Sequence, residues 1–151
     1  MDTVRDFEDI LDLFAHHDVR YLIVGGLAFI FHAKPRYTKD IDLWLEPERE
    51  NVERANRALA AFGSPYFLDA ENSGEILQLG VAPNRVDLLR DPGGSSGIHF
   101  ADAWRCRIDS RYGAAQAHWI DLDHLIAIKS GIDHPRHQED ARVLREVRNR
   151  K

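Results

Sequence analysis

The chain has 151 residues, of which 44% are hydrophobic and 30% are charged, and its net charge at pH 7 is −5. These proportions are ordinary for a globular protein and exclude a mainly disordered chain, while the negative charge disfavours a protein that coats DNA. The single cysteine, Cys106, excludes an internal disulfide and favours a reducing compartment, so a cytoplasmic protein is expected.

The first half of the chain alternates predicted helices and strands. Residues 3–17 carry apolar side chains at helical spacing, and their acidic character does not match a secretory signal peptide. The longest apolar run, residues 22–31, is broken by two glycines and falls short of the ~18 residues of a membrane span, so no membrane partner is expected. After the first helix, the pattern predicts a strand at 21–24, a turn at 25–26, a buried helix at 27–33, a strand at 41–45, and a helix with Pro47 as its first residue that ends at Gly63.

The second half continues the alternation and completes an α+β chain. It predicts strands at 75–81 and 85–89 joined by the turn Ala82-Pro83-Asn84, a flexible loop at 91–97, a hairpin of residues 104–109 and 116–120, a helix from Asp121 to Ser130, and a last helix from Pro135. The fold class expected is α+β, with a small mixed β-sheet flanked by helices. We expect a single domain over residues 1–151, with a core at about 1–91 and a C-terminal hairpin and helices at about 98–151.

Two aspartates, Asp40 and Asp42, lie at the start of a predicted strand. Side chains at positions i and i+2 of a strand point to the same side, so the two carboxylates are expected to lie close together. Like charges at that distance raise each other's pKa unless a cation neutralises them. Mg²⁺ is the usual partner of paired carboxylates with substrate phosphates. The alternative is a strand edge with two solvated aspartates.

A third aspartate, Asp87, lies within the apolar strand at 85–89. A carboxylate in such a run is costly to bury unless it is paired or bound to a metal. If this strand neighbours residues 41–45, three carboxylates can hold two metal ions, and the third can accept a proton from an attacking hydroxyl. Alternatively, Asp87 points outward from a half-exposed strand.

Gly25 and Gly26 follow a strand and open a helix. Without Cβ atoms, the backbone there can approach a phosphate closely, and the amide groups at a helix start favour anions. The alternative is a tight turn that binds nothing. The sequence contains neither a Walker lysine loop nor a GxGxxG motif, which excludes those two nucleotide sites.

The order strand, GG, helix, R-x-T-x-D-I-D-L and a later strand with one more aspartate resembles the nucleotidyltransferase superfamily with the polymerase-β-like core. It is closest in pattern to the small toxin-type branch of AbiEii-like and MenT-like proteins. Residues 100–104, a hairpin and then residues 123–129 resemble the C-terminal pattern of that branch, which ends in a helical lysine. The residues that match the family pattern are Gly25, Gly26, Arg36, Thr38, Asp40, Asp42, Asp87 and Lys129.

The resemblance implies metal-dependent transfer of a nucleoside monophosphate from an NTP to an acceptor, with Mg²⁺ or Mn²⁺ as the cofactor and pyrophosphate as the leaving group. It implies that Asp40 and Asp42 bind the metal ions and that Asp87 completes the metal site and acts as the base. The nucleotide would be held by Gly25, Gly26, Arg36, Thr38 and Lys129. The acceptor is open between a protein hydroxyl, an RNA end and a small molecule, including a drug, and a toxin-type role would add a cognate antitoxin as a partner. The alternative is a catalytically inactive module of the same fold that binds or regulates a partner.

Lys129 has support of its own, because its predicted helix places it on the same apolar face as Leu122, Leu125 and Ile126. A lysine there needs either an anion, such as a triphosphate, or a route by which its charged end reaches solvent. Arg36 and the nearby Lys39 offer further positive charge beside the aspartate pair, although either alone is ordinarily a solvated residue.

Residues 134–140 depart from the family pattern. Arg136 and Asp140 fit the R-x-K-D-x-x-D motif of related proteins, but His134 and His137 replace its first arginine and first aspartate. A toxin-type acceptor is therefore less secure than the metal and nucleotide sites. His134, His137 and Asp140 also have the spacing of a zinc site, although exposed residues at a helix start are the simpler interpretation.

Overall fold

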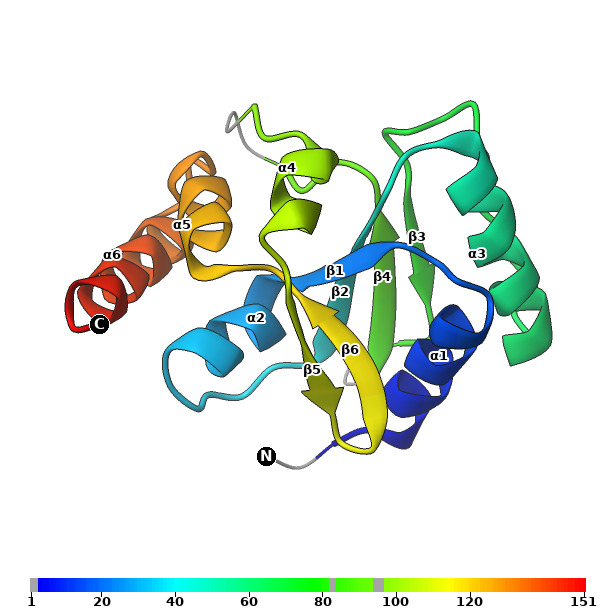
Figure 1. Ribbon diagram of the computed structural model, residues 1–151, viewed down its shortest axis with the longest axis horizontal. Coiled ribbons are helices and arrows are strands. Elements are labelled where there is room, and N and C mark those ends of the chain that lie inside the picture. Colours follow the sequence, from blue (N-terminus) through cyan, green and yellow to red (C-terminus); the bar gives the residue numbers. More distant parts are fainter. Residues whose placement is uncertain (1–2, 82–83, 94–96) are drawn as a thin grey trace.

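A computed structural model describes residues 3–81, 84–93 and 97–151 (Figure 1). The predicted turn at 82–84 and the predicted loop at 91–97 lie partly outside these residues. No helix in the described ranges is both long and apolar enough to cross a membrane. The elements are α1 (Arg5–His16), β1 (Tyr21–Val24), α2 (Gly25–His32), β2 (Asp40–Leu45), α3 (Arg49–Phe62), β3 (Ile76–Leu79), β4 (Arg85–Leu89), α4 (Phe100–Arg105), β5 (Ile108–Tyr112), β6 (Ala115–Trp119), α5 (Leu122–Ser130) and α6 (Pro135–Asn149).

The strands form one mixed sheet in the order β3-β4-β2-β1-β6-β5, with helices packed on it (Figure 1). β2 runs antiparallel to β1 and parallel to β4, and β6 runs parallel to β1. The sheet therefore includes strands from both the predicted core and the predicted C-terminal part. The predicted α+β class with a mixed sheet and flanking helices is confirmed.

Side-chain alternation along β2 explains how the two faces of the sheet differ. Ile41, Leu43 and Leu45 are buried in the larger core cluster together with α1 and α3. Trp44 points to the opposite face and packs in a second cluster with α4 and α5. Because side chains two apart share a face, Asp40 and Asp42 lie on the face of Trp44, toward α5 and α6.

The predicted start of α3 is wrong by two residues. Pro47 is not the first helical residue, because the helix begins at Arg49 with Glu48 as its N-cap. The chain stays paired beyond β2, since the Glu46 amide donates to the Arg20 carbonyl. The buried Asn51 amide then donates to the carbonyls of Arg20 and Glu46, which fixes where the first helical turn starts.

The predicted strand at 104–109 is also wrong in its first half. Trp104 belongs to α4, and the hairpin consists of β5 and β6, from Ile108 to Trp119. Phe100 and Ala103 are buried in the second cluster, where the Phe100 ring meets the Trp44 ring edge to face at a centroid distance of 5.3 Å. The contact of Phe100 with Trp44 of β2 favours a helix at residues 100–105. Because Trp44 is distant in the sequence, no local pattern predicts this contact.

Candidate active site

Asp42 and Asp87 lie opposite each other on neighbouring strands. β2 and β4 pair in parallel, and their register sets Asp40 beside Arg85 and Asp42 beside Asp87. On the other side of β2, Asp42 pairs with Val24, the last residue before the Gly25–Gly26 turn. The fold thus brings the three aspartates singled out from the sequence to one place, next to the glycine turn.

A guanidinium group that the sequence analysis did not identify bridges these acids. Arg85 donates to both oxygens of Asp87, at 2.8 and 3.1 Å, and to Oδ2 of Asp40 at 2.9 Å. The hydrogen bonds to Asp87 and the negative charge of Asp87 raise the pKa of Arg85 above its ordinary value. Arg85 lies two residues before Asp87 in the same strand, so the two side chains point to the same side of the sheet. The same rule that placed Asp40 beside Asp42 could therefore have predicted that Arg85 reaches the acids.

The environment of Asp42 disfavours its charge. Burial raises the pKa of this carboxyl to about 7, and the charges of Asp87 and Asp40 add to the effect. A protonated Asp42 can donate a hydrogen bond to Asp87. In addition, Oδ1 of Asp40 is buried without a hydrogen-bond donor among the described residues. Unpaired carboxylate oxygens and mutual repulsion are the conditions that a bound divalent cation relieves, so the chemistry of these acids fits Mg²⁺ or Mn²⁺. Among the described residues, the ligand atoms of the three acids do not all lie within 4.8 Å of one another, and Arg85 holds Asp40 and Asp87, so metal binding requires these side chains to move together.

The glycine turn makes room for side chains of the protein itself. Gly25 has φ +67°, and a Cβ added there would lie 2.1 Å from Oδ2 of Asp42. A Cβ on Gly26 would lie 2.8 Å from Oγ1 of Thr38. The sequence analysis attributed both glycines to the approach of a phosphate. The structure gives a further reason, since Asp42 reaches its position only against a backbone that lacks a side chain.

A buried ion network lies beside the turn. Asp140 of α6 accepts two hydrogen bonds from Arg36, at 2.7 and 3.0 Å, and one from Nζ of Lys129 at 2.9 Å. Burial alone would raise the pKa of Asp140, but the bonds from Arg36 and Lys129 lower it below the ordinary value. The guanidinium of Arg36 also lies over the Phe29 ring, 4.1 Å from its centroid. Both cations are therefore held in fixed positions by partners from two helices, α2 and α6.

Lys129 is buried, so the alternative in which its charged end reaches solvent is wrong. Its side chain is 4% exposed, and burial lowers the pKa of its ammonium group. Nζ also donates to Nδ1 of His137 at 3.3 Å. Burial and the charge of Lys129 lower the pKa of His137, which favours the neutral ring that accepts this bond. The anion that Lys129 meets is Asp140 of this chain.

Two cavities meet at Asp42. One of about 480 Å³ is polar and is lined by Gly25, Gly26, Arg36, Tyr37, Thr38, Lys39, Asp40, Asp42, Lys129, Arg136, His137 and Asp140. The other, of about 260 Å³, shares Gly25, Asp42, Lys129 and His137, and its remaining lining is mostly apolar: Val24, Ile76, Leu89, Asp91, Pro92, Gly93, Leu125, Ile128 and Ile132. All the predicted nucleotide-binding residues line the polar cavity, with the cations on its wall. Asp87 lines neither cavity and lies beside Asp42 on the neighbouring strand β4.

The histidines at the start of α6 have structural partners. Nδ1 of His134 accepts a hydrogen bond from the Arg136 amide at 3.1 Å, so His134 caps the helix. His137 faces Lys129 instead. Within the described ranges, the ligand atoms of His134, His137 and Asp140 do not converge as a three-residue metal site, so the zinc alternative for this set is wrong.

The comparisons with known proteins bear on the fold. Neither a protein-family model nor a curated protein matches the sequence. Among solved structures, the chain is similar to the lincosamide antibiotic adenylyltransferase LnuA in its lincomycin-bound crystal structure, with a TM-score of 0.56 and 16% sequence identity over 97% of this chain and 99% of that chain. At this identity the likeness shows the fold. The predicted nucleotidyltransferase fold is confirmed, and the toxin-type branch stays a prediction.

Proposed function

We propose that this protein is a metal-dependent nucleotidyltransferase that moves a nucleoside monophosphate from an NTP to a hydroxyl acceptor. One observation carries the proposal. Asp40 and Asp42 line the same cavity as the buried cation Lys129 and the anchored Arg36, and Asp87 is paired with Asp42 on the neighbouring strand. Phosphoryl-type transfer depends on positioning and charge neutralisation, which this arrangement of acids and cations supplies.

The roles of the residues follow from their chemistry. Asp40, Asp42 and Asp87 would hold Mg²⁺ or Mn²⁺, which when bound neutralises the phosphates and the acids together. Lys129 and Arg36 would contact the phosphates, and Thr38 and the Gly25–Gly26 turn would border them. For Asp87 to act as the base, its oxygens must first be released by Arg85, which donates to both of them.

The acceptor we favour is a small molecule with a hydroxyl group. LnuA, which shares this fold, is an antibiotic adenylyltransferase that was crystallised with lincomycin. In this chain, the mostly apolar cavity of about 260 Å³ opens on the same Asp42 as the polar cavity, and its size suits a small acceptor better than a polymer. The competing possibilities are a protein acceptor and an RNA acceptor. Either of these would support a toxin role with a cognate antitoxin, and the experiment below distinguishes them.

The test is to incubate the pure protein with each α-labelled NTP, Mg²⁺ and one of three acceptor pools: small-molecule extract, total RNA, or protein extract. We expect transfer of label to small molecules with one preferred NTP. Asp42→Asn and Asp40→Asn should abolish transfer, whereas Asp102→Asn, which removes an exposed acid on α4, should not. NTP binding without transfer to any pool would favour the inactive binding module, and neither binding nor transfer would refute the proposal.

A further inference from the structure

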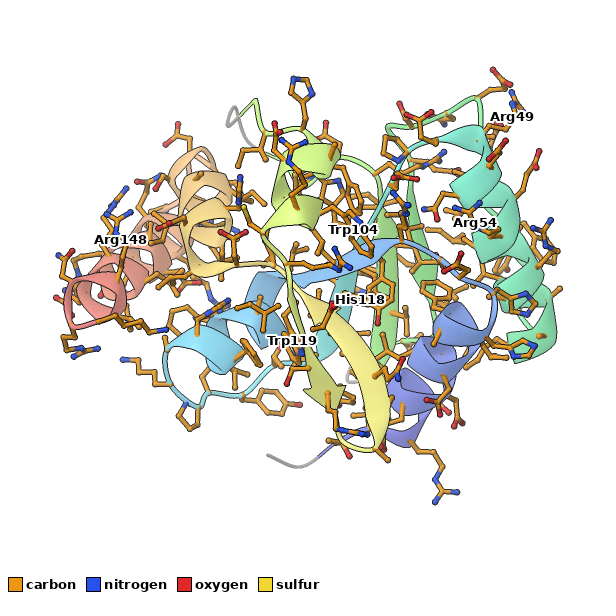
Figure 2. The ribbon with its side chains drawn as sticks, in the orientation of Figure 1. Arg49, Arg54, Trp104, His118, Trp119 and Arg148 are labelled. Carbon is orange, nitrogen blue, oxygen red and sulfur yellow. The ribbon has the colours of Figure 1, made fainter. Side chains whose placement is uncertain are left out.

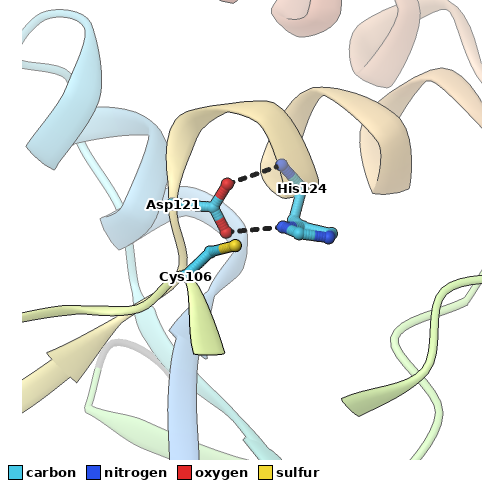
Figure 3. A group of neighbouring side chains, drawn as sticks. All are labelled: Cys106, Asp121 and His124. Carbon is cyan, nitrogen blue, oxygen red and sulfur yellow. Dashed lines mark hydrogen bonds and ion pairs between the residues drawn. The ribbon is translucent and has the colours of Figure 1, made fainter. Parts of the chain in front are cut away.

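Three side chains with metal-ligand atoms converge outside the two cavities that Asp42 lines, where α4 ends and α5 begins. Cys106 is the C-cap of α4, Asp121 is the N-cap of α5, and His124 lies one turn into that helix. One ligand atom from each lies within 4.8 Å of the other two, and this is the one such three-residue group within the described ranges. Figure 3 shows the Cys106 thiol directed at the Asp121–His124 pair.

The Asp121–His124 pair is held in place. Oδ2 of Asp121 accepts from the His124 amide at 3.2 Å, and Oδ1 lies 2.7 Å from Nδ1 of the His124 ring (Figure 3). Their side chains are only 16% and 24% exposed. An aspartate and a histidine three residues apart at a helix start thus present an oxygen and a nitrogen to the same point, which the exposed thiol of Cys106 can reach from another element.

The two arginines that flank Cys106 are bound to other groups, so they do not compete with a metal ion for its thiol. Arg105 and Arg107 flank Cys106, but Arg105 is bound to Asp102, and Arg107 donates to Asp109 and to the Trp104 carbonyl. The Arg107 guanidinium also stacks on Trp104 at 3.9 Å from the ring centroid. The Trp104 ring in turn lies beside the His118 ring (Figure 2).

We propose that Cys106, Asp121 and His124 form a binding site for a zinc-class divalent cation, separate from the magnesium-type acids. Thiolate, imidazole and carboxylate are the three protein ligands that Zn²⁺ prefers, and a water molecule would complete a tetrahedral shell. A set containing sulfur and nitrogen selects against Mg²⁺, which requires oxygen ligands. The two sites therefore differ in the metal they take.

Binding requires a small closure of the site. In a tetrahedral zinc shell, neighbouring oxygen and nitrogen ligands are about 3.3 Å apart, so the Asp121–His124 contact must widen by roughly half an ångström while the Cys106 side chain rotates inward. His124 Nδ1 and the thiol must both be deprotonated, so uptake releases protons and tightens as pH rises. The ion would fasten the end of α4 to the start of α5, the helix whose last turn carries Lys129.

Cobalt substitution tests the proposal directly, because the chain has one cysteine. Titration of the full-length protein with Co²⁺ in the presence of excess Mg²⁺ should produce a thiolate-to-cobalt charge-transfer band and tetrahedral visible bands that saturate near one equivalent, and Zn²⁺ should displace them. Cys106→Ser should abolish the charge-transfer band. His124→Ala should weaken Co²⁺ binding at least tenfold, given that even loss of groups that only orient metal ligands costs about that much.

Two matched variants separate this site from helix capping and from the acids. Asp121→Asn keeps a good N-cap but removes the anionic ligand, so the fold should persist while Co²⁺ affinity falls. Asp42→Asn should leave the bands unchanged. As a second measurement, Zn²⁺ should slow alkylation of Cys106 in wild type but not in His124→Ala. Absence of the band in wild type, or a band that persists unchanged in both His124→Ala and Asp121→Asn, would overturn the proposal.

Discussion

Replacing Asp42 with asparagine should stabilise the metal-free protein at pH 8, although it removes a candidate catalytic residue. Burial and the neighbouring acids raise the pKa of Asp42 from 3.8 to about 7 in the folded state. Between these pH values the folded chain holds a proton that the unfolded chain has released. The free energy of unfolding of wild type therefore falls as pH rises from about 4 to about 7, and the loss is complete above pH 7.

The size of the effect follows from the shift. A difference of about three pH units corresponds to roughly 4 kcal/mol, at about 1.4 kcal/mol for each unit. Asp42 is only partly buried, so solvent screens its charge and we expect about half of this value. Asparagine has no charge to bury and keeps the size of the side chain, so Asp42→Asn should be about 2 kcal/mol more stable than wild type at pH 8. The two proteins should be nearly equal at pH 4.

Urea denaturation in EDTA at pH 4, 6 and 8 measures this difference. With Mg²⁺ in place of EDTA, wild type should gain stability at pH 8 and the variant should gain little, because an ion that binds only the native state stabilises it. Asp102→Asn serves as the control, since this exposed acid should show no comparable pH-dependent gain. A stability difference between Asp42→Asn and wild type that is the same at all three pH values would refute the reasoning.

Three further predictions address the neighbours of Asp42. Arg85→Met should weaken the metal-free fold and raise Mg²⁺ or Mn²⁺ affinity several-fold by calorimetry, because Arg85 occupies oxygens of Asp40 and Asp87; unchanged affinity would mean that the metal does not compete with it. Gly25→Ala should cost at least 1–2 kcal/mol more than Gly63→Ala in thermal or urea unfolding, since both positions have positive φ but only the Cβ at Gly25 would collide with Asp42. Lys129→Met should weaken NTP binding about ten- to hundredfold while leaving nucleoside binding unchanged; equal losses for both ligands would assign Lys129 to structure alone.

The local pattern of the sequence was sufficient to predict the acids as a group. Period-two alternation places Asp40 and Asp42 on one side of a strand, and the apolar run around Asp87 marks it as a buried carboxylate. Their convergence depends on a longer-range fact, the parallel pairing of β2 with β4 in a register that sets Asp42 against Asp87. No short-range signal specifies that register, and the family resemblance supplied only the expectation that Asp87 completes the site.

Tertiary packing decided the features that the sequence analysis missed. α4 replaces a predicted strand because Phe100 packs on Trp44, which is 56 positions earlier in the chain. The two cations that line the polar cavity depend on Asp140, which binds both of them. Asp140 lies 104 positions after Arg36 and 11 positions after Lys129 in the sequence. Arg85 was missed for a different reason, because a single arginine beside an acid is ordinarily a solvated residue.

The site carries its own counter-ions on both sides, and under the proposed function this decides how its ligands would bind. Arg85 holds the acids that a metal ion would take, and Asp140 holds the two cations that a triphosphate would contact. These internal pairs keep buried charges satisfied when no ligand is bound, since an unpaired buried charge is strongly destabilising. Under the proposed function, a metal ion would have to displace the guanidinium of Arg85, and phosphates would have to share Lys129 and Arg36 with Asp140. Because the charges of these acids oppose a triphosphate until a metal ion neutralises them, metal and NTP should bind with positive cooperativity, each more tightly in the presence of the other.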